Sequence, residues 1–175
     1  MSTHPLPGTE VIRLWNILIR SVLMIRKATI KDAAVIAEFN YCLAKETEAL
    51  ELNKETLYKG VQKVLSDESK GIYFVYEKDD KVVGQLMITK EWSDWRNGDF
   101  WWIQSVYVHK DYRRQGIYTS LFHHVKSIVD SDDTICGLRL YVEKENETAK
   151  NTYKALGMKE THYLLYELSA PNKSL

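Results

Sequence analysis

Apolar positions along the chain follow two spacings, and each spacing predicts one kind of element. A spacing of three or four residues, typical of amphipathic helices, recurs in four segments: 29–43, 53–65, 116–129 and 145–157. Runs rich in β-branched and aromatic residues, typical of strands, occur in six others: 23–28, 71–77, 81–92, 99–110, 134–144 and 158–168. The order β-α-α-β-β-β-α-β-α-β predicts an α/β fold, one domain with a mixed sheet of about six strands and helices on both faces.

Short polar signals indicate where several of these elements begin and end. Thr29 followed by Asp32 resembles a helix start, and Asn53 can cap the second helix. Gly157 is a plausible C-cap for the last helix. The run 99–110, "DFWWIQSVYVHK", is apolar on both faces, as in a central strand that is covered on each side.

The N-terminal region needs a separate interpretation because residues 11–25 are strongly apolar. This run is shorter than the ~20 residues that span a bilayer, and it lacks the charge order of a signal peptide. A helix packed on the domain or on a partner, an inessential leader and a membrane-surface helix all remain open. We therefore take residues 1–22 as an extension, expected to be helical, 23–170 as the domain and 171–175 as a C-terminal tail.

Charge and cysteine content narrow the classes of partner. Twenty-four basic residues balance 24 acidic ones, so there is no bulk attraction to nucleic acid or to an anionic membrane. Cys42 and Cys136 are far apart and indicate reduced thiols of a cytoplasmic protein, although one disulfide stays open. His123 and His124 are adjacent and diverge by ~100° on a helix, so no metal site is expected.

The segment "VYVHKDYRRQGIYT" runs from a strand through a turn into a helix. A helix N-terminus offers free backbone N–H groups to a phosphate, arginines add charge-assisted contacts, and a glycine lets a ligand approach the backbone. An ordinary turn with solvated arginines is the alternative at this point. The candidate ligand-binding residues are Val106, Tyr107, Val108, Arg113, Arg114, Gln115, Gly116, Ile117, Tyr118 and Thr119.

A second candidate surface lies on the last predicted helix. Asn146, Ala149, Tyr153 and Gly157 are three, four and four positions apart, so they share one face at ~3.6 residues per turn. Amide, methyl, phenol and glycine make poor core material and suit a face along which a slim ligand passes. A small-residue packing contact is the alternative.

Together the two motifs resemble those of the GNAT-type N-acetyltransferases, which use acetyl-CoA. Val106-Tyr107-Val108 matches the family's apolar-x-apolar triplet, and Arg113, Gly116 and Ile117 match its loop R/Q-x-x-G-x-G/A. The later pattern N-x-x-A-x-x-x-Y-x-x-x-G-F/M is met at Asn146, Ala149, Tyr153, Gly157 and Met158. The resemblance covers roughly residues 24–168. Tyr118 departs from it, because the family usually has glycine or alanine there, but tyrosine retains the backbone N–H.

The resemblance implies direct attack of an amine on the thioester of acetyl-CoA, in a ternary complex. It gives Tyr153 the role of general acid and a backbone N–H near Val106–Val108 the role of donor to the thioester oxygen. The base stays open between Glu91, Asp94, Glu46, Glu48 and a water positioned by Gln104. We expect a primary amine of a small molecule as acceptor; a protein lysine or N-terminal amine, or a non-catalytic acetyl-CoA-binding module, are alternatives. A homodimer is a further expectation from the family.

Overall fold

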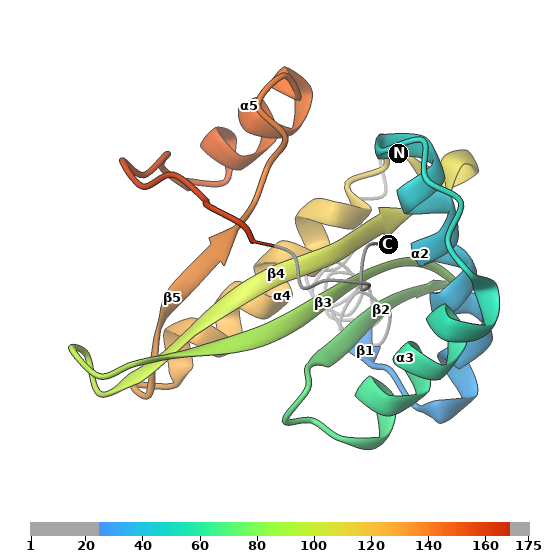
Figure 1. Ribbon diagram of the computed structural model, residues 1–175, viewed down its shortest axis with the longest axis horizontal. Coiled ribbons are helices and arrows are strands. Elements are labelled where there is room, and N and C mark those ends of the chain that lie inside the picture. The colour runs from blue at the N-terminus through green and yellow to red at the C-terminus, as the bar shows by residue number, and fades with distance from the viewer. Residues whose placement is uncertain (1–24, 169–175) are drawn as a thin grey trace, which may run out of the picture. The chain divides into compact units, whose positions relative to one another are not determined.

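The computed structural model describes residues 25–168 (Figure 1). The strands are β1 (Ile25–Lys27), β2 (Ile72–Lys78), β3 (Lys81–Ser93), β4 (Gly98–Val108) and β5 (Ile135–Leu140). The helices are α2 (Ala33–Thr47), α3 (Lys54–Ser66), α4 (Ile117–Ser131) and α5 (Glu147–Ala155), with short 3-10 turns η1 (Ile30–Asp32) and η2 (Lys110–Tyr112). The expectations for residues 1–22 and 171–175 lie outside the described part.

The strands form one mixed sheet in the order β1-β2-β3-β4-β5. The pairs β1–β2, β2–β3 and β3–β4 are antiparallel, and α4 connects β4 to β5 (Figure 1). The predicted α/β fold is therefore confirmed, but the sheet has five strands within residues 25–168 rather than about six.

The strand predicted at 158–168 is wrong, because this segment has no strand in the structure. Its pattern of apolar residues does suit a strand, but a strand also needs a neighbouring backbone to satisfy its N–H and C=O groups. The segment instead leaves its large side chains in solvent, with Tyr166 88% and Leu168 97% exposed. A local sequence pattern cannot supply that partner.

Helices cover both faces of the sheet, as predicted. Alternate residues of a strand point to opposite faces, and β2 follows this rule. Tyr73 and Val75 belong to a buried cluster with residues of α2 and α3. Phe74, between them, packs edge-on against His124 of α4, with ring centroids 5.2 Å apart. The core therefore has two layers, and β2 to β4 lie between them.

A close approach between α4 and β3 depends on Gly84. A Cβ at this position would lie 2.7 Å from Cγ2 of Ile117, the first residue of α4. Real Cβ atoms essentially never come this close to another heavy atom. The glycine thus lets the start of α4 sit directly against the sheet, which fixes where the preceding loop ends.

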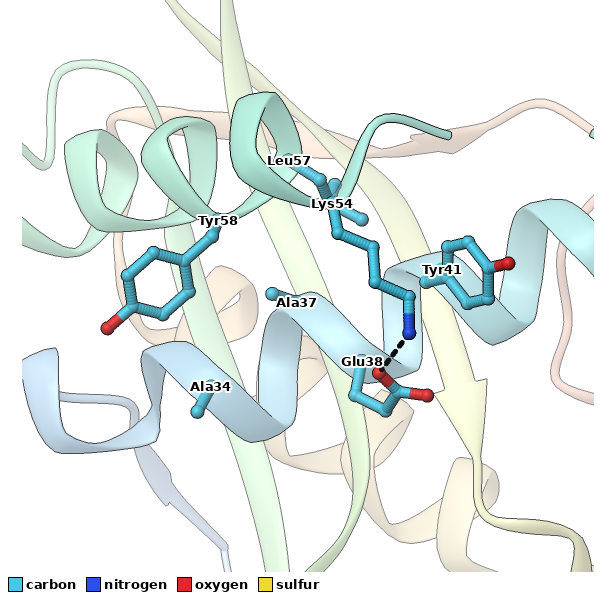
Figure 2. A pocket seen from close by; sticks show the side chains of 7 residues that line it. All are labelled: Ala34, Ala37, Glu38, Tyr41, Lys54, Leu57 and Tyr58. Carbon is cyan, nitrogen blue, oxygen red and sulfur yellow. Dashed lines mark hydrogen bonds and ion pairs between the residues drawn. The ribbon is translucent and has the colours of Figure 1, made fainter. Parts of the chain in front are cut away.

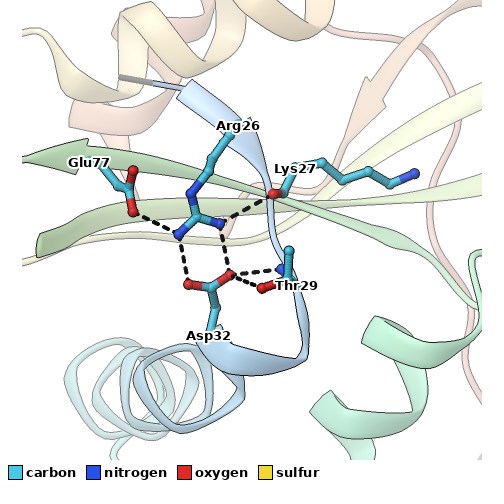
Figure 3. A network of polar contacts seen from close by, with 5 residues as sticks. All are labelled: Arg26, Lys27, Thr29, Asp32 and Glu77. Atoms are coloured by element: carbon cyan, nitrogen blue, oxygen red, sulfur yellow. Dashed lines mark hydrogen bonds and ion pairs between the residues drawn. The ribbon is translucent and has the colours of Figure 1, made fainter. Parts of the chain in front are cut away.

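The start of α2 is anchored to β1 and β2 by a network of polar contacts (Figure 3). Arg26 donates to both carboxylate oxygens of Asp32 at 2.8 Å and to Glu77 at 2.7 Å. The backbone N–H of Thr29 donates to Asp32 at 2.7 Å, as in a capping box. The helix start predicted from Thr29 and Asp32 is confirmed, and the same carboxylate also ties the helix to the sheet.

The chain divides into two compact units at Arg139 and Leu140. The first contains the sheet with α2, α3 and α4, and the second contains α5. None of the helices within residues 25–168 combines the length and the apolar character needed to cross a membrane.

Candidate functional site: the β4–α4 loop and its surroundings

The loop between β4 and α4 has the predicted strand–turn–helix form. After Val108 the chain passes through η2 and reaches two residues in the left-handed region, Arg114 (φ 61°) and Gly116 (φ 75°). Gly116 adopts this conformation without strain, whereas for a residue with a Cβ it costs roughly 1–2 kcal/mol. Arg114, which has a Cβ, is therefore strained, and strained backbone is common at ligand sites.

The N-terminus of α4 has the properties that a phosphate site requires. The first intrahelical bond is Ser120 N–H to Gly116 O at 2.9 Å, so the N–H groups of Ile117, Tyr118 and Thr119 precede the helix's own ladder. A Cβ built on Gly116 would meet no atom within 4 Å. The loop therefore leaves open space beside the first-turn N–H groups and the positive end of a helix, and its residues fit a pyrophosphate.

Tyr118, the departure from the family pattern, packs along its own helix. Its ring lies beside that of Phe122, one turn further on, with centroids 6.3 Å apart. Because the side chain follows the helix surface, its bulk is directed along α4 while its backbone N–H stays in the first turn.

Arg113 is held by two different groups. Its Nε donates to the carbonyl of Val108 at 2.9 Å, and its Nη2 pairs with Oε2 of Glu46 at 2.6 Å. The other oxygen of Glu46 accepts from the hydroxyl of Tyr107 at 2.8 Å. Glu46, at the end of α2, thus contacts both β4 and the β4–α4 loop.

The electrostatics of this cluster stabilise its charged form. Burial opposes ionisation of Glu46, but hydrogen bonds from Arg113 and Tyr107 lower the pKa of its carboxyl. The pKa of Tyr107 is raised by burial and by the adjacent carboxylate. At neutral pH Glu46 is therefore an anion that occupies the guanidinium of Arg113.

The strand β4 contains a bulge just before the loop. Gln85 of β3 faces Tyr107, while Met87 faces Gln104, so Leu86 alone lies opposite two residues, Ser105 and Val106. Ser105 has φ 48°, in the left-handed region. A bulge leaves its extra residue outside the regular ladder and redirects the backbone. Val106, predicted to face the ligand, lies at this irregularity.

The structure gives firm partners to both predicted polar residues of the sheet. Nε2 of Gln104 donates to Oγ1 of Thr89 at 2.6 Å. Glu91 accepts from Nη1 of Arg139 at 2.9 Å and also from the indole of Trp102. Both oxygens of Glu91 are therefore engaged, and the catalytic roles of Gln104 and Glu91 stay predictions.

The remaining predicted residues belong to the second unit. Asn146 is the N-cap of α5, and its Oδ1 accepts from the N–H of Ala149 at 3.0 Å. Gly157 follows the helix with φ 87°, which suits the predicted C-cap. Burial raises the pKa of Tyr153, so its hydroxyl is protonated at neutral pH.

A shallow hollow of about 180 Å³ lies elsewhere, between α2 and α3 (Figure 2). Its lining is mainly apolar, with the Nζ of Lys54 4.2 Å from the ring centroid of Tyr41 and 3.4 Å from Glu38. It shares no residue with the β4–α4 loop. Residues 25–168 contain no group of three or more His, Cys, Asp or Glu that could hold a metal ion.

Sequence reasoning missed a buried polar network beneath the bulge. It consists of Asn40, Tyr73 and Gln85, which meet the backbone of Ser105. One signal was present: Gln85 is the single polar residue in the otherwise apolar run "VVGQLMI" of a strand that the hydrophobic pattern places in the core.

The chain is similar to known acetyltransferases in both sequence and structure. The model of the acetyltransferase (GNAT) family matches residues 37–158, more than half of the chain. A search of curated proteins gave no match. A possible acetyltransferase from Clostridium difficile 630 is 57% identical, with a TM-score of 0.80, and the match covers 83% of this chain and 96% of that one.

More distant structures share the fold. A predicted acetyltransferase from Clostridium acetobutylicum, crystallised with acetyl-CoA, is 19% identical, with a TM-score of 0.67 over 83% of this chain and 94% of that one. A ribosomal-protein-alanine N-acetyltransferase from Brucella melitensis biovar Abortus 2308 is 16% identical, with a TM-score of 0.66 over 83% and 98% of the two chains. The resemblance inferred from the two motifs is confirmed, and the chain belongs to the GNAT family of acetyltransferases.

Proposed function

We propose that the protein transfers the acetyl group of acetyl-CoA to a primary amine of a small molecule. The observation that carries this is the β4–α4 loop. The first turn of α4, the open space at Gly116 and the arginines beside it match what the pyrophosphate of the cosubstrate requires. Acetyl-CoA supplies the acetyl group as a thioester.

The residues of the chain have three tasks in this reaction. A base or a water chain removes a proton from the amine, because an alkylamine with a pKa of ~10.4 is mostly unreactive at neutral pH. The nitrogen then attacks the thioester carbon, while a backbone N–H at the bulge donates to the oxygen on which charge builds. As the C–S bond breaks, Tyr153 gives its proton to the leaving thiolate.

The preference for a small cationic amine is supported by the charge of the connection between α2 and α3. Residues 46–51 include Glu46, Glu48 and Glu51, and the structure places Glu46 against Tyr107 of β4. Glu46 is paired with Arg113 and Glu51 with Lys45, so Glu48 would supply the negative charge that attracts a protonated amine. Such an attraction selects a positively charged acceptor and requires no peptide backbone.

A screen for release of free CoA tests the proposal. The purified protein is mixed with acetyl-CoA and one acceptor at a time: diamines and polyamines, amino sugars, and peptides with a free lysine or N-terminus. We expect turnover with at least one small amine. Turnover with peptides alone would assign the protein to the protein-directed class. Binding of acetyl-CoA without any turnover would identify a non-catalytic module.

The contact between Glu46 and Arg113 leads to a separate prediction. Because Glu46 occupies the guanidinium that a phosphate would bind, Glu46→Gln should tighten CoA binding about three- to fivefold, the size of one exposed ion pair. Isothermal titration at pH 7.5 measures the dissociation constant. Glu51→Gln removes the same charge from the same connection without touching Arg113 and serves as the control. Weaker binding by the Glu46 variant would contradict the competition.

A further inference from the structure

A buried polar network supports the bulge of β4 from the side of α2. Nε2 of Gln85 donates to Oδ1 of Asn40 at 2.7 Å and to the carbonyl of Ser105 at 3.3 Å. Nδ2 of Asn40 donates to the hydroxyl of Tyr73 at 2.9 Å. Side chains from α2, β2 and β3 therefore form a chain of hydrogen bonds that ends at one backbone carbonyl of β4.

Two features of this network destabilise the folded state. Gln85 is completely buried, and its Oε1 finds no hydrogen-bond donor within the described part of the chain. A buried acceptor without a donor costs about 1–3 kcal/mol, and a leucine would avoid that cost. Ser105 adds backbone strain of roughly 1–3 kcal/mol. Such a combination is typical of a functional position rather than of a packing solution.

Peptide geometry connects the network to the N–H of Val106. The carbonyl of Ser105 and the N–H of Val106 belong to one peptide group, which is planar and trans, so the two bonds point in opposite directions. Gln85 of β3 holds the carbonyl. The N–H of Val106 is therefore turned away from Gln85, and the neighbour of β4 on the side opposite to β3 is β5.

We propose that Gln85 and Asn40 are positioning residues that fix this peptide plane and so aim the N–H of Val106 at the thioester oxygen of acetyl-CoA. The inference rests on the proposed function. The new element is that Gln85 and Asn40 hold the N–H of Val106 in place before the ligand arrives. A donor that is already oriented stabilises the developing charge without first having to reorganise. Tyr73 is the titratable side chain of the network, and burial raises its pKa, so it stays neutral below pH 10.

Binding of two ligands tests the inference without an acceptor amine. Acetyl-CoA has the thioester oxygen, whereas S-ethyl-CoA lacks it and keeps the pyrophosphate. The ratio of their dissociation constants therefore isolates the donor at the bulge. For the wild-type protein we expect acetyl-CoA to bind about fivefold more tightly, the value of one hydrogen bond.

Gln85→Glu supplies a readout that a purely structural role would not give. At pH 8 the new carboxylate would face two acceptors, Asn40 Oδ1 and Ser105 O. The two ligands should then bind about equally well. At pH 5 the protonated carboxyl can again donate, and the preference should return. Ile88→Val, on the same strand but in the apolar core, should keep the wild-type ratio at both pH values.

The outcomes separate this inference from the proposed function. A wild-type protein that binds neither ligand would overturn both. Equal binding of the two ligands by the wild type, an unchanged ratio in Gln85→Glu at pH 8, or a preference that does not return at pH 5 would each overturn the inference alone. If Gln85→Glu does not fold, Asn40→Leu removes the second anchor of Gln85, and it should reduce the preference at least twofold. An unchanged ratio in that variant would overturn the inference.

Discussion

Tyr153→Phe is expected to lower kcat for acetyl transfer by about a hundredfold or more, the usual contribution of a general acid, while CoA binding stays within about twofold. The variant removes only the hydroxyl. Burial raises the pKa of Tyr153, so the hydroxyl holds its proton throughout the neutral range and can give it to the leaving thiolate. Stopped assays of CoA release measure kcat, and titration measures binding.

The matched control is Tyr163→Phe in the same unit, since Tyr163 is 73% exposed and belongs to neither motif. It should retain wild-type kcat. The alkaline side of the wild-type pH profile gives a second check: because the general acid must be protonated, its contribution to kcat should persist up to about pH 10, the ordinary tyrosine pKa, and be lost at higher pH. An unchanged kcat in Tyr153→Phe would remove the acid role from this residue.

Asp32→Ala is expected to give the largest loss of stability, about 3 kcal/mol, or roughly 10 °C in melting temperature. The substitution leaves Arg26 with Glu77 but without its bidentate partner, and it removes the acceptor for the N–H of Thr29 (Figure 3). Asp130→Ala, which breaks an exposed ion pair with Lys126, should change the melting temperature little. A shift as small as that of the control would show that the network is dispensable.

The carboxylate of Asp32 should also make the stability of the fold depend on pH. The hydrogen bond from Arg26 lowers the pKa of Asp32, and burial opposes this only in part. A carboxyl whose pKa is lower in the folded than in the unfolded protein stabilises the fold. This stabilisation is fully present above the unfolded pKa of ~3.9 and is lost as pH falls through the folded pKa. Melting temperatures of the wild type and of Asp32→Asn should therefore converge below pH 4. A difference that stays constant down to pH 2 would contradict this sign.

Features of the fold with local causes were predictable from the sequence. Thr29 and Asp32 form the expected helix start, and Asn53 caps α3 by accepting from the N–H of Thr56 at 2.9 Å. The β4–α4 loop was also predictable, because a glycine that needs a left-handed conformation directly precedes an amphipathic helix. These signals act over three or four residues, within the range that a sequence pattern can show.

Features that depend on contacts between distant residues were not predictable. Glu46 and Arg113 are 67 positions apart, and their ion pair depends on how α2 lies over β4. The bulge at Ser105 arises from the register between β3 and β4, which residue propensities do not encode. The strand predicted at 158–168 fails for the same reason, since pairing is decided by a partner and not by the segment itself.

A thermal-shift titration with acetyl-CoA, CoA, ATP and NAD, each added separately, tests the central claim most directly. A ligand at ~100 times its dissociation constant adds about 2.7 kcal/mol of stability, which moves the melting temperature of a domain this size by several degrees. We predict such shifts with acetyl-CoA and CoA and none of that size with ATP or NAD. No shift with either CoA compound would contradict the account, because the loop before α4 would then not bind the cosubstrate.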